Sequence, residues 1–387
     1  MKLSELLDTD LLQEYIAEGL VEKGACGFAP LDLYAHSRRA VLEQVWDDIT
    51  ETCRGLIVHR ETGEIVSRPF RKFFNVDTSW KPETCVSNLP LTKPVISEKL
   101  DGSMGILYQC WVPSQLDPEG RCILSGIATK GSFHSDQAKW ATEWYRDHLQ
   151  GAEWPEGYTA MFEIIAESVQ HHVVHYNGIE ELVLLALIKN ETGEELNPES
   201  LKLWGRRNGV RVTDFYDRKG LGDVLNEDRK NADGYVLSWP RAGQPPLKIK
   251  VKHPSFLDLQ KIVHAATPRA ILDALMHSNV DLLNSWIGQT NDQLGQWVQS
   301  WVVKFNGKYA NILLKCRMAT NAAITKNETR KDFALYIQNE ASKFEYVHPS
   351  VCFAMLDGKD HRPIIWKFVE KAFEGELSQA FAVVEEQ

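Results

Sequence analysis

The sequence predicts an α+β protein in which mainly antiparallel sheets are followed by an all-α C-terminal domain. From about residue 53 to 252, short apolar and β-branched runs alternate with turn signals, which is typical of strands. After Pro254, apolar residues recur at helical spacing instead. The chain has 387 residues, of which 43% are hydrophobic, so it can form more than one sizeable core. We therefore expect two domains, 1–253 and 254–387.

The first strands are predicted on both sides of a turn. The runs "RGLIVHR" and "EIVSRPF" flank Glu61-Thr62-Gly63-Glu64, a pattern that favours a β-hairpin. Further strands are expected at the runs "MGILYQCWV", "CILSGIATK", "TAMFEIIAES", "ELVLLALI", "GYVLSW" and "LKIKVK".

Helices are predicted from apolar spacing and from capping signals. The segment 135–149 has a helical pattern, and either Ser135 or Asp136 is placed to cap it. In the C-terminal part, Thr267-Pro268 marks a helix start. We expect the tryptophans at 286, 297 and 301 to be core residues of helices.

Composition excludes several classes of protein. The seven cysteines are widely spaced without a CxxC pair, which supports neither a disulfide framework nor a zinc site. No signal-peptide pattern and no membrane-length apolar run is present, so we expect a cytoplasmic protein without a membrane partner. The net charge is −10, yet basic residues cluster at 68–72, 205–211 and 248–252, and a local basic groove is enough for nucleic acid.

The chemistry centres on Lys99 in the string "EKLDGS". A Lys-x-Asp-Gly string alone is weak evidence, because Asp101 and Gly102 also suit an ordinary turn. Three further charged elements follow on expected strands, in this order: Phe162-Glu163, Asp233-Gly234 and Lys248-Ile249-Lys250. Four such elements in this order are much less probable by chance than the Lys-x-Asp-Gly string alone.

These elements resemble the signature of the covalent nucleotidyltransferases, the superfamily of ATP-dependent ligases and mRNA capping enzymes. Segments 53–75, 128–138 and 183–194 narrow the resemblance to the RNA ligase 1 family typified by the T-even bacteriophage enzyme. The resemblance covers about residues 30–253. It implies an adenylyltransferase domain with an N-terminal module in 1–253, and a helical domain in 254–387 that helps to select RNA.

The resemblance implies that Lys99 is the nucleophile that attacks the α-phosphorus of ATP and forms a lysyl-AMP. A lysine of pKa about 10.4 is only ~0.1% neutral near pH 7.4, so the site must disfavour its charge. Lys248 and Lys250 lie two residues apart on one strand face, where they would lower that pKa and hold the α-phosphate. Lys252 shares their face but lies beyond the matched motif.

The resemblance also assigns nucleotide and metal ligands. Glu163 and Asp233 would hold a divalent cation, Mg²⁺ or Mn²⁺, and Asp233 departs from the Glu that is usual in the family. The remaining residues implied in the nucleotide pocket are Arg54 and Lys72 for the triphosphate, Phe74 as a closing aromatic, Lys130, Glu98, Asp101, Gly102 and Gly234.

The function implied by the resemblance is an ATP-dependent RNA ligase. It would join 5′-phosphate and 3′-hydroxyl RNA ends, such as those of cleaved tRNA, through a lysyl-AMP and an RNA-adenylate. We expect a monomer that works in the cytoplasm, which would be the host cytoplasm if the protein is encoded by a phage. We also expect it to work together with an end-healing kinase-phosphatase. Two alternatives stay open: another covalent nucleotidyltransferase, such as a capping-type guanylyltransferase or a DNA ligase, and an inactive RNA-binding homologue.

A histidine-rich run follows Glu163, with histidines at 171, 172 and 175. No acidic or cysteine partner stands at a fixed metal-binding spacing, so contact with RNA is favoured over metal binding.

Overall fold

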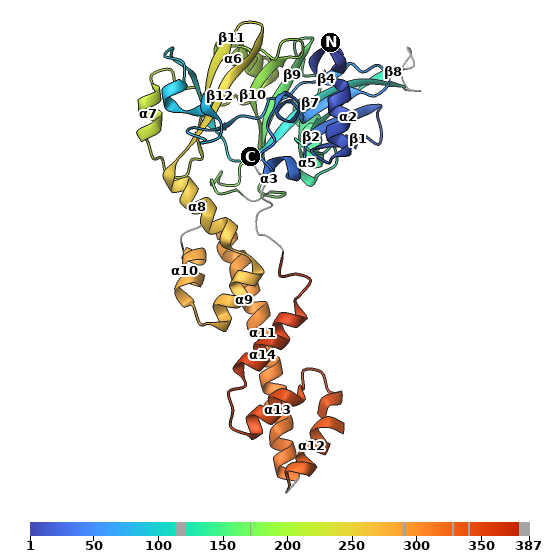
Figure 1. Cartoon of the computed structure of the whole chain (residues 1–387), viewed down its shortest axis with the longest axis vertical. Helices are drawn as coiled ribbons and strands as arrows, with labels where there is room; N and C mark the ends of the chain where they lie inside the picture. The colour runs from blue at the N-terminus through green and yellow to red at the C-terminus, as the bar shows by residue number, and fades with distance from the viewer. Residues whose placement is uncertain (114–120, 171, 289–291, 327–328, 340, 379–387) are drawn as a thin grey trace. The chain divides into compact units, whose positions relative to one another are not determined.

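The computed structural model describes residues 1–113, 121–170, 172–288, 292–326, 329–339 and 341–378. The chain divides into two compact units, Met1–Leu257 and Asp258–Gln387. The first unit combines sheets and helices, and the described part of the second is helical (Figure 1). The predicted α+β fold class, with mainly antiparallel sheets and a helical C-terminal region, is confirmed.

The N-terminal module is one four-stranded sheet, ordered β1-β2-β3-β4, with short helices. The predicted hairpin forms, because β3 pairs antiparallel with β4 across the turn. Leu12 and Leu56 are fully buried in its core, which joins α2 to the sheet. The elements are α1 (Leu3–Leu6), α2 (Thr9–Ala17), β1 (Val21–Ala25), β2 (Leu31–His36), α3 (Arg38–Leu42), α4 (Asp48–Thr52), β3 (Arg54–His59) and β4 (Ile65–Ser67).

Two further four-stranded sheets complete the strand content of the first unit, ordered β10-β9-β7-β8 and β5-β12-β11-β6. Their strand pairs are antiparallel except for β5 with β12. All six strand runs predicted above lie on strands, from β7 to β12. The strands are β5 (Phe74–Asn75), β6 (Val95–Lys99), β7 (Ser103–Pro113), β8 (Arg121–Ala128), β9 (Tyr158–Ile165), β10 (Glu181–Lys189), β11 (Gly234–Arg241) and β12 (Gln244–Lys252).

The helix predicted at 135–149 begins where the sequence indicates. Helix α5 (Asp136–His148) is capped by Ser135, whose hydroxyl accepts a hydrogen bond from the Ala138 N–H at 3.2 Å. Ala141 and Tyr145 of α5 pack into a buried core with residues of both β8 and β10. The remaining short elements are η1 (Pro82–Thr84), η2 (Val86–Asn88), α6 (Pro198–Asn208) and α7 (Leu221–Asn226).

The second unit is built around one long helix, α11, which contacts α9, α10, α12, α13 and α14. Thr267 caps α9 as predicted, and Trp286 and Trp301 are buried. No helix in the described part of the chain is both long and apolar enough to cross a membrane. The helices after β12 are α8 (Pro254–Ala265), α9 (Pro268–Met276), α10 (Val280–Gly288), α11 (Asp292–Lys326), α12 (Arg330–Asn339), η3 (Ala341–Lys343), α13 (Pro349–Leu356) and α14 (Arg362–Ala372).

Candidate functional site

Lys99 ends β6 and lies beside the start of β11. Gly234 pairs with Lys99 on one side and with Lys252 of β12 on the other, so three strands meet at this point. The Lys99 ammonium donates a hydrogen bond to Oδ2 of Asp233, with which it forms an ion pair. The side chains of Lys99 and Asp233 are 10% and 0% exposed. The sheet register thus brings together two residues that are 134 positions apart.

The glycines at this point are required by close approach. A Cβ on Gly234 would lie 2.0 Å from the Val251 carbonyl oxygen, and one on Gly102 would lie 2.8 Å from Cγ of Glu163. Gly102 therefore allows the turn after Lys99 to lie directly against Glu163 on β9. The predicted carboxylate Glu163 is consequently near the turn that follows the nucleophile candidate.

The charges around Lys99 favour its ammonium form. Burial alone would lower the pKa of Lys99, but the carboxylates of Asp233, Glu163 and Asp101 outweigh burial and hold the pKa above its ordinary value. Oδ1 of Asp233 is buried and has no hydrogen-bond partner within the described residues. Lys99 is therefore protonated in this state, and one carboxylate oxygen beside it has a vacant acceptor position.

The side chains of Lys250 and Lys252 lie on the same face of β12, and both are close to Lys99. Burial, followed by the charges of Lys99, Lys72, Lys252 and Arg54, holds the pKa of Lys250 well below its ordinary value. Burial also lowers the pKa of Lys252, although the Asp233 carboxylate opposes this. Lys252 pairs in register with Gly234, which pairs with Lys99 on its other side, so Lys252 is the lysine of β12 nearest to Lys99 along the sheet. The sequence analysis noted that Lys252 shares the face of Lys248 and Lys250 but placed it beyond the matched motif.

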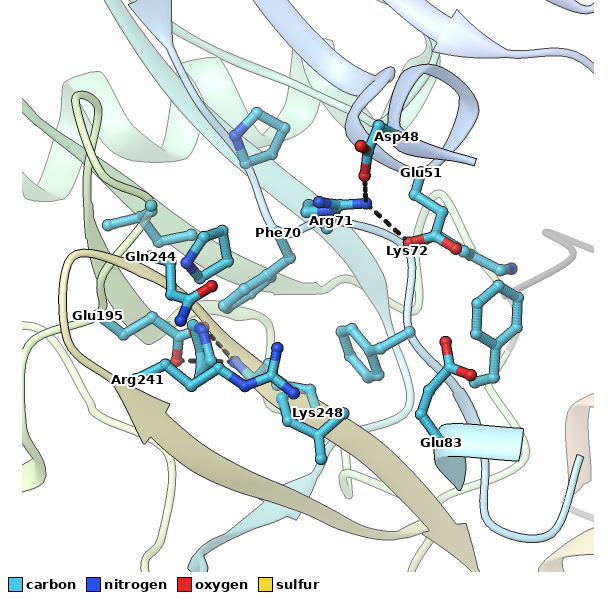
Figure 2. A pocket seen from close by; sticks show the side chains of 18 of the residues that line it. Asp48, Glu51, Phe70, Arg71, Lys72, Glu83, Glu195, Arg241, Gln244 and Lys248 are labelled. Carbon is cyan, nitrogen blue, oxygen red and sulfur yellow. Dashed lines mark hydrogen bonds and ion pairs between the residues drawn. The ribbon is translucent and has the colours of Figure 1, made fainter. Parts of the chain in front are cut away.

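Lys248 lies elsewhere on β12. Lys248 pairs in register with Ser238. It is four residues from Lys252, which corresponds to about 13 Å along a strand. Its ammonium forms two hydrogen bonds with the Glu195 carboxylate, at 2.6 and 2.7 Å, and lies 3.9 Å from the centre of the Phe70 ring. Figure 2 shows Lys248 and Glu195 in contact beside a pocket. The sequence analysis did not identify Glu195.

A second group of cations gathers at the N-terminal module. The Arg54 guanidinium lies 5.4 Å from the Phe73 ring, and the Lys72 ammonium lies 5.8 Å from the Phe74 ring. Lys130 is close to the same point, because its backbone would lie 3.1 Å from a Cβ on Gly55. The predicted residues Arg54, Lys72, Phe74 and Lys130 are thus near neighbours in space.

His36, which the sequence analysis did not identify, lies among these cations. Burial, then the charges of Arg54, Lys72 and Lys130, lower the pKa of His36 to about 3, so its ring is neutral. Its Nδ1 is 3.2 Å from the Thr50 carbonyl oxygen and 3.1 Å from that of Cys53, and can donate to either. A neutral ring adds no further positive charge to the cluster.

The carboxylates of Glu98 and Asp101 interact with groups in other parts of the chain. Glu98 lies on the opposite face of β6, as strand alternation requires, and its carboxylate is 3.8 Å from Arg229. Asp101 accepts hydrogen bonds from the Val173 and Val174 N–H groups at 2.6 and 2.9 Å. Asp101 therefore anchors the segment after β9 beside the nucleophile candidate.

Two histidines of the histidine-rich run, His172 and His175, lie within the described residues. His171 lies outside the described residues. His172 is 3% exposed and its Nε2 accepts a hydrogen bond from the Ala166 N–H, whereas His175 is exposed. Within the described part of the chain, no group of three or more His, Cys, Asp or Glu side chains is arranged to hold a metal ion.

Comparison with known proteins gives one family. The family model described as RNA ligase matches residues 52–256. A curated putative RNA ligase of Thermovibrio ammonificans is 32% identical over 235 residues, which are 58% of this chain and 57% of that protein. The chain thus spans somewhat more than half of that relative's length.

Solved structures with detectable similarity include two RNA ligases. An archaeal ATP-dependent RNA ligase is 14% identical over 74% of this chain and 72% of its own, with a TM-score of 0.45. The Naegleria gruberi RNA ligase with PPi is 16% identical over 44% of this chain and 52% of its own, with a TM-score of 0.31.

Proposed function

The chain belongs to the RNA ligase family, and from this membership and the Lys99 site we propose that it is an ATP-dependent RNA ligase. It would join a 5′-phosphate to a 3′-hydroxyl in RNA. The family match covers the segments on which the sequence resemblance was based, so that resemblance is confirmed. The observation that carries the proposal is the buried Lys99, paired with Asp233 and flanked by Lys250 and Lys252.

In the first step, neutral Lys99 attacks the α-phosphorus of ATP. An N–P bond forms, the bond between the α-phosphorus and the bridging oxygen breaks, and pyrophosphate leaves while the lysine nitrogen loses a proton. Lys250 and Lys252 lie on the side of β12 nearest to Lys99, so they supply positive charge where negative charge develops. We assign this task to Lys250 and Lys252, and a structural task to Lys248.

The carboxylates suit a divalent cation. Oδ1 of Asp233 is buried without a partner in the described structure, and Glu163 lies against the turn that follows Lys99. Mg²⁺ prefers oxygen ligands and usually keeps several of its bound waters, and Mn²⁺ accepts the same ligands. Asp233 and Glu163 would therefore hold such an ion directly or through its waters. Bound there, the ion would supply positive charge that disfavours the ammonium form of Lys99 and neutralises phosphate.

The cations of the N-terminal module would orient the triphosphate. Arg54, Lys72 and Lys130 lie near the neutral His36 ring, and Arg54 and Lys72 also lie near Lys250. Positioning and charge neutralisation supply most of the catalysis in phosphoryl-type transfer. Asp101 would act as a positioning residue, because it holds the backbone at Val173 and Val174.

The later steps use the same site. AMP would pass from Lys99 to the RNA 5′-phosphate, and the 3′-hydroxyl would then attack that phosphate while AMP leaves. Repair of broken RNA, including cleaved tRNA, is the task we propose, in the cytoplasm and beside an end-healing kinase-phosphatase. The helical second unit would contribute to RNA selection.

The decisive experiment separates the nucleotide, the nucleophile and the nucleic acid. The protein is incubated with Mg²⁺ and either ATP or GTP labelled at the α-phosphate, and protein-bound label is measured. We expect label from ATP, none on Lys99→Ala, and joining of 5′-phosphorylated RNA in preference to the equivalent DNA. Label from GTP alone would favour a capping-type enzyme, and preference for DNA would favour a DNA ligase. An absence of label with retained RNA binding would favour an inactive homologue.

A further inference from the structure

A pocket of about 400 Å³ lies beside the Lys99 site, between residues 68–74 and the β11–β12 hairpin (Figure 2). Residues of α4 and η1 complete its wall. The volume is in the range of small-molecule sites. Lys72 and Phe74, which the sequence resemblance places in the nucleotide pocket, line this space, whereas Arg241 has no task in the proposed reaction.

The carboxylates of the pocket are already engaged. Arg71 forms ion pairs with Asp48 at 2.8 Å and with Glu51 at 3.0 Å. Glu83 is 3.1 Å from the Lys81 ammonium, and Glu195 is held by Lys248. Their negative charges are therefore largely neutralised by the protein itself.

Arg241 differs from Arg71, Lys81 and Lys248, which pair with carboxylates of the pocket. It stands at the end of β11, at the exposed mouth, and within the described residues no carboxylate lies at ion-pair distance from its guanidinium. Figure 2 shows its side chain extending across the pocket beside Lys248. Arg241 thus offers an uncompensated positive charge to a ligand.

The inner wall is aromatic. Phe70, Phe73 and Phe74 line the space, and the ring centres of Phe70 and Phe73 are 6.3 Å apart. Phe70 and Phe74 are buried, whereas Phe73 is half-buried and offers ring surface to a ligand. Nucleobases bind to such side chains by stacking, without requiring a particular sequence. The pocket therefore combines a surface for a flat base with a cation for a phosphate.

Lys72 and β12 connect the pocket to the reaction site. Lys72 lines the pocket, and its charge also contributes to the low pKa of Lys250. Phe74 pairs in register with Ile249, which lies between Lys248 and Lys250. A phosphate held at Lys72 would thus lie on the side of the pocket that is nearest to Lys250.

We propose that this pocket binds the 5′-terminal nucleotide of the RNA strand that receives AMP. Its 5′-phosphate would lie toward Lys72, its base against Phe73, and the next phosphate against Arg241. The inference rests on the proposed ligase function and adds the place of one RNA end.

The first test measures RNA binding without ATP, so that no chemistry occurs. A short 5′-phosphorylated oligoribonucleotide and its 5′-hydroxyl counterpart are titrated against the full chain, Arg241→Ala, Arg241→Lys and the control Arg206→Ala. Arg206 is an exposed arginine on α6 that does not line the pocket. We expect Arg241→Ala to raise the Kd for the phosphorylated RNA about tenfold, with partial recovery in Arg241→Lys and a change under about twofold in the control.

The second test identifies the ligand class. Lysyl-AMP formation is measured over a range of ATP concentrations in the same variants. An Arg241→Ala variant with a raised KM for ATP and an unchanged Kd for RNA would assign the pocket to the triphosphate and overturn the proposal. Equal binding of 5′-phosphate and 5′-hydroxyl RNA, or no effect of Arg241→Ala on either assay, would also overturn it. Loss of RNA binding in Arg241→Ala, in a protein that forms no lysyl-AMP, would support the pocket while the ligase function fails.

Discussion

Lys99 and Asp233 form a buried ion pair in which Oδ2 of Asp233 accepts from the lysine ammonium and Oδ1 has no partner within the described residues. Burying two charges is costly unless the remaining lone pairs are also satisfied. A further positive charge at Oδ1 would therefore stabilise the pair. Without such a charge, the Asp233 carboxylate keeps Lys99 protonated.

Replacing Asp233 by Asn separates these two effects. The pKa of Lys99 should fall in Asp233→Asn, because the strongest neighbouring charge that favours the ammonium form is removed. If protonation of Lys99 were all that slows the reaction, lysyl-AMP would form faster in this variant. We expect it to form at least about 100-fold more slowly, because a carboxylate that would hold a cation is lost. Rates of labelling from ATP at several pH values measure this.

Asp233→Glu is the matched control for that experiment, since it keeps the charge and restores the residue that is usual in the family. We expect it to stay within about tenfold of the unsubstituted protein. An Asn variant that labels as fast as the Glu variant would show that Asp233 holds no cation.

The lysines of β12 should differ sharply in their roles. Lys252→Ala should slow lysyl-AMP formation by about 100-fold or more, because Lys252 pairs with the residue opposite Lys99. Lys248→Met should affect the free energy of unfolding instead, because it leaves the half-buried Glu195 carboxylate without its partner, at a cost of about 3 kcal/mol. Labelling with ATP and urea unfolding of both variants measure the two effects.

The double variant Lys248→Met with Glu195→Leu is the control, since removing both charges should restore part of the stability. A Lys248→Met protein that is fully stable but unable to form lysyl-AMP would contradict this division of roles.

The neutral His36 makes stability depend on pH. Its folded-state pKa of about 3 lies below the unfolded value of about 6.5, so the unfolded chain binds the extra proton between these values. The stability contributed by the neutral ring is therefore complete above about pH 6.5 and falls as pH decreases toward 3. We expect a loss of about 2 kcal/mol at pH 5 from this residue alone.

The measurement compares urea unfolding of the unsubstituted protein with that of His36→Gln between pH 5 and 8. A glutamine does not titrate, so the difference in the free energy of unfolding between the two proteins should change with pH. A constant difference would show that His36 titrates normally in the folded protein.

Local patterns predicted most of the fold. Alternation and turn residues identified every strand from β7 to β12, and capping residues placed the starts of α5 and α9. The same alternation indicates that Glu98, next to Lys99, lies on the opposite face of β6. These features depend only on neighbouring residues, which is why the sequence reveals them.

The missed residues depend on contacts between distant segments. Alternation shows that Lys248, Lys250 and Lys252 share a face, but it cannot show which of them lie beside Lys99, because that depends on the register of β11 and β12. An irregularity between Trp239 and Arg241 shifts this register. His36 joins the cations of the site through an N-terminal sheet whose contacts with Lys72 and Lys130 have no local signature.

Gly234 gives the most direct test of that register. A Cβ at this position would lie 2.0 Å from the Val251 carbonyl oxygen and 2.8 Å from Cα of Lys252, so Gly234→Ala must push β11 and β12 apart. Lys252 and Asp233 would then move away from Lys99. We expect lysyl-AMP formation to fall by more than about 100-fold, while the far-ultraviolet circular dichroism of the folded chain is retained.

Gly222→Ala is the matched control for Gly234→Ala. Gly222 lies in α7, and a Cβ there meets no atom within 4 Å. Alanine is favoured over glycine in a helix by about 1 kcal/mol, so this variant should be at least as stable and should label normally. If Gly234→Ala labelled as well as Gly222→Ala, the close pairing of β11 with β12 would not be what positions Asp233 and Lys252 around the nucleophile, and the assignment of Lys252 would fail with it.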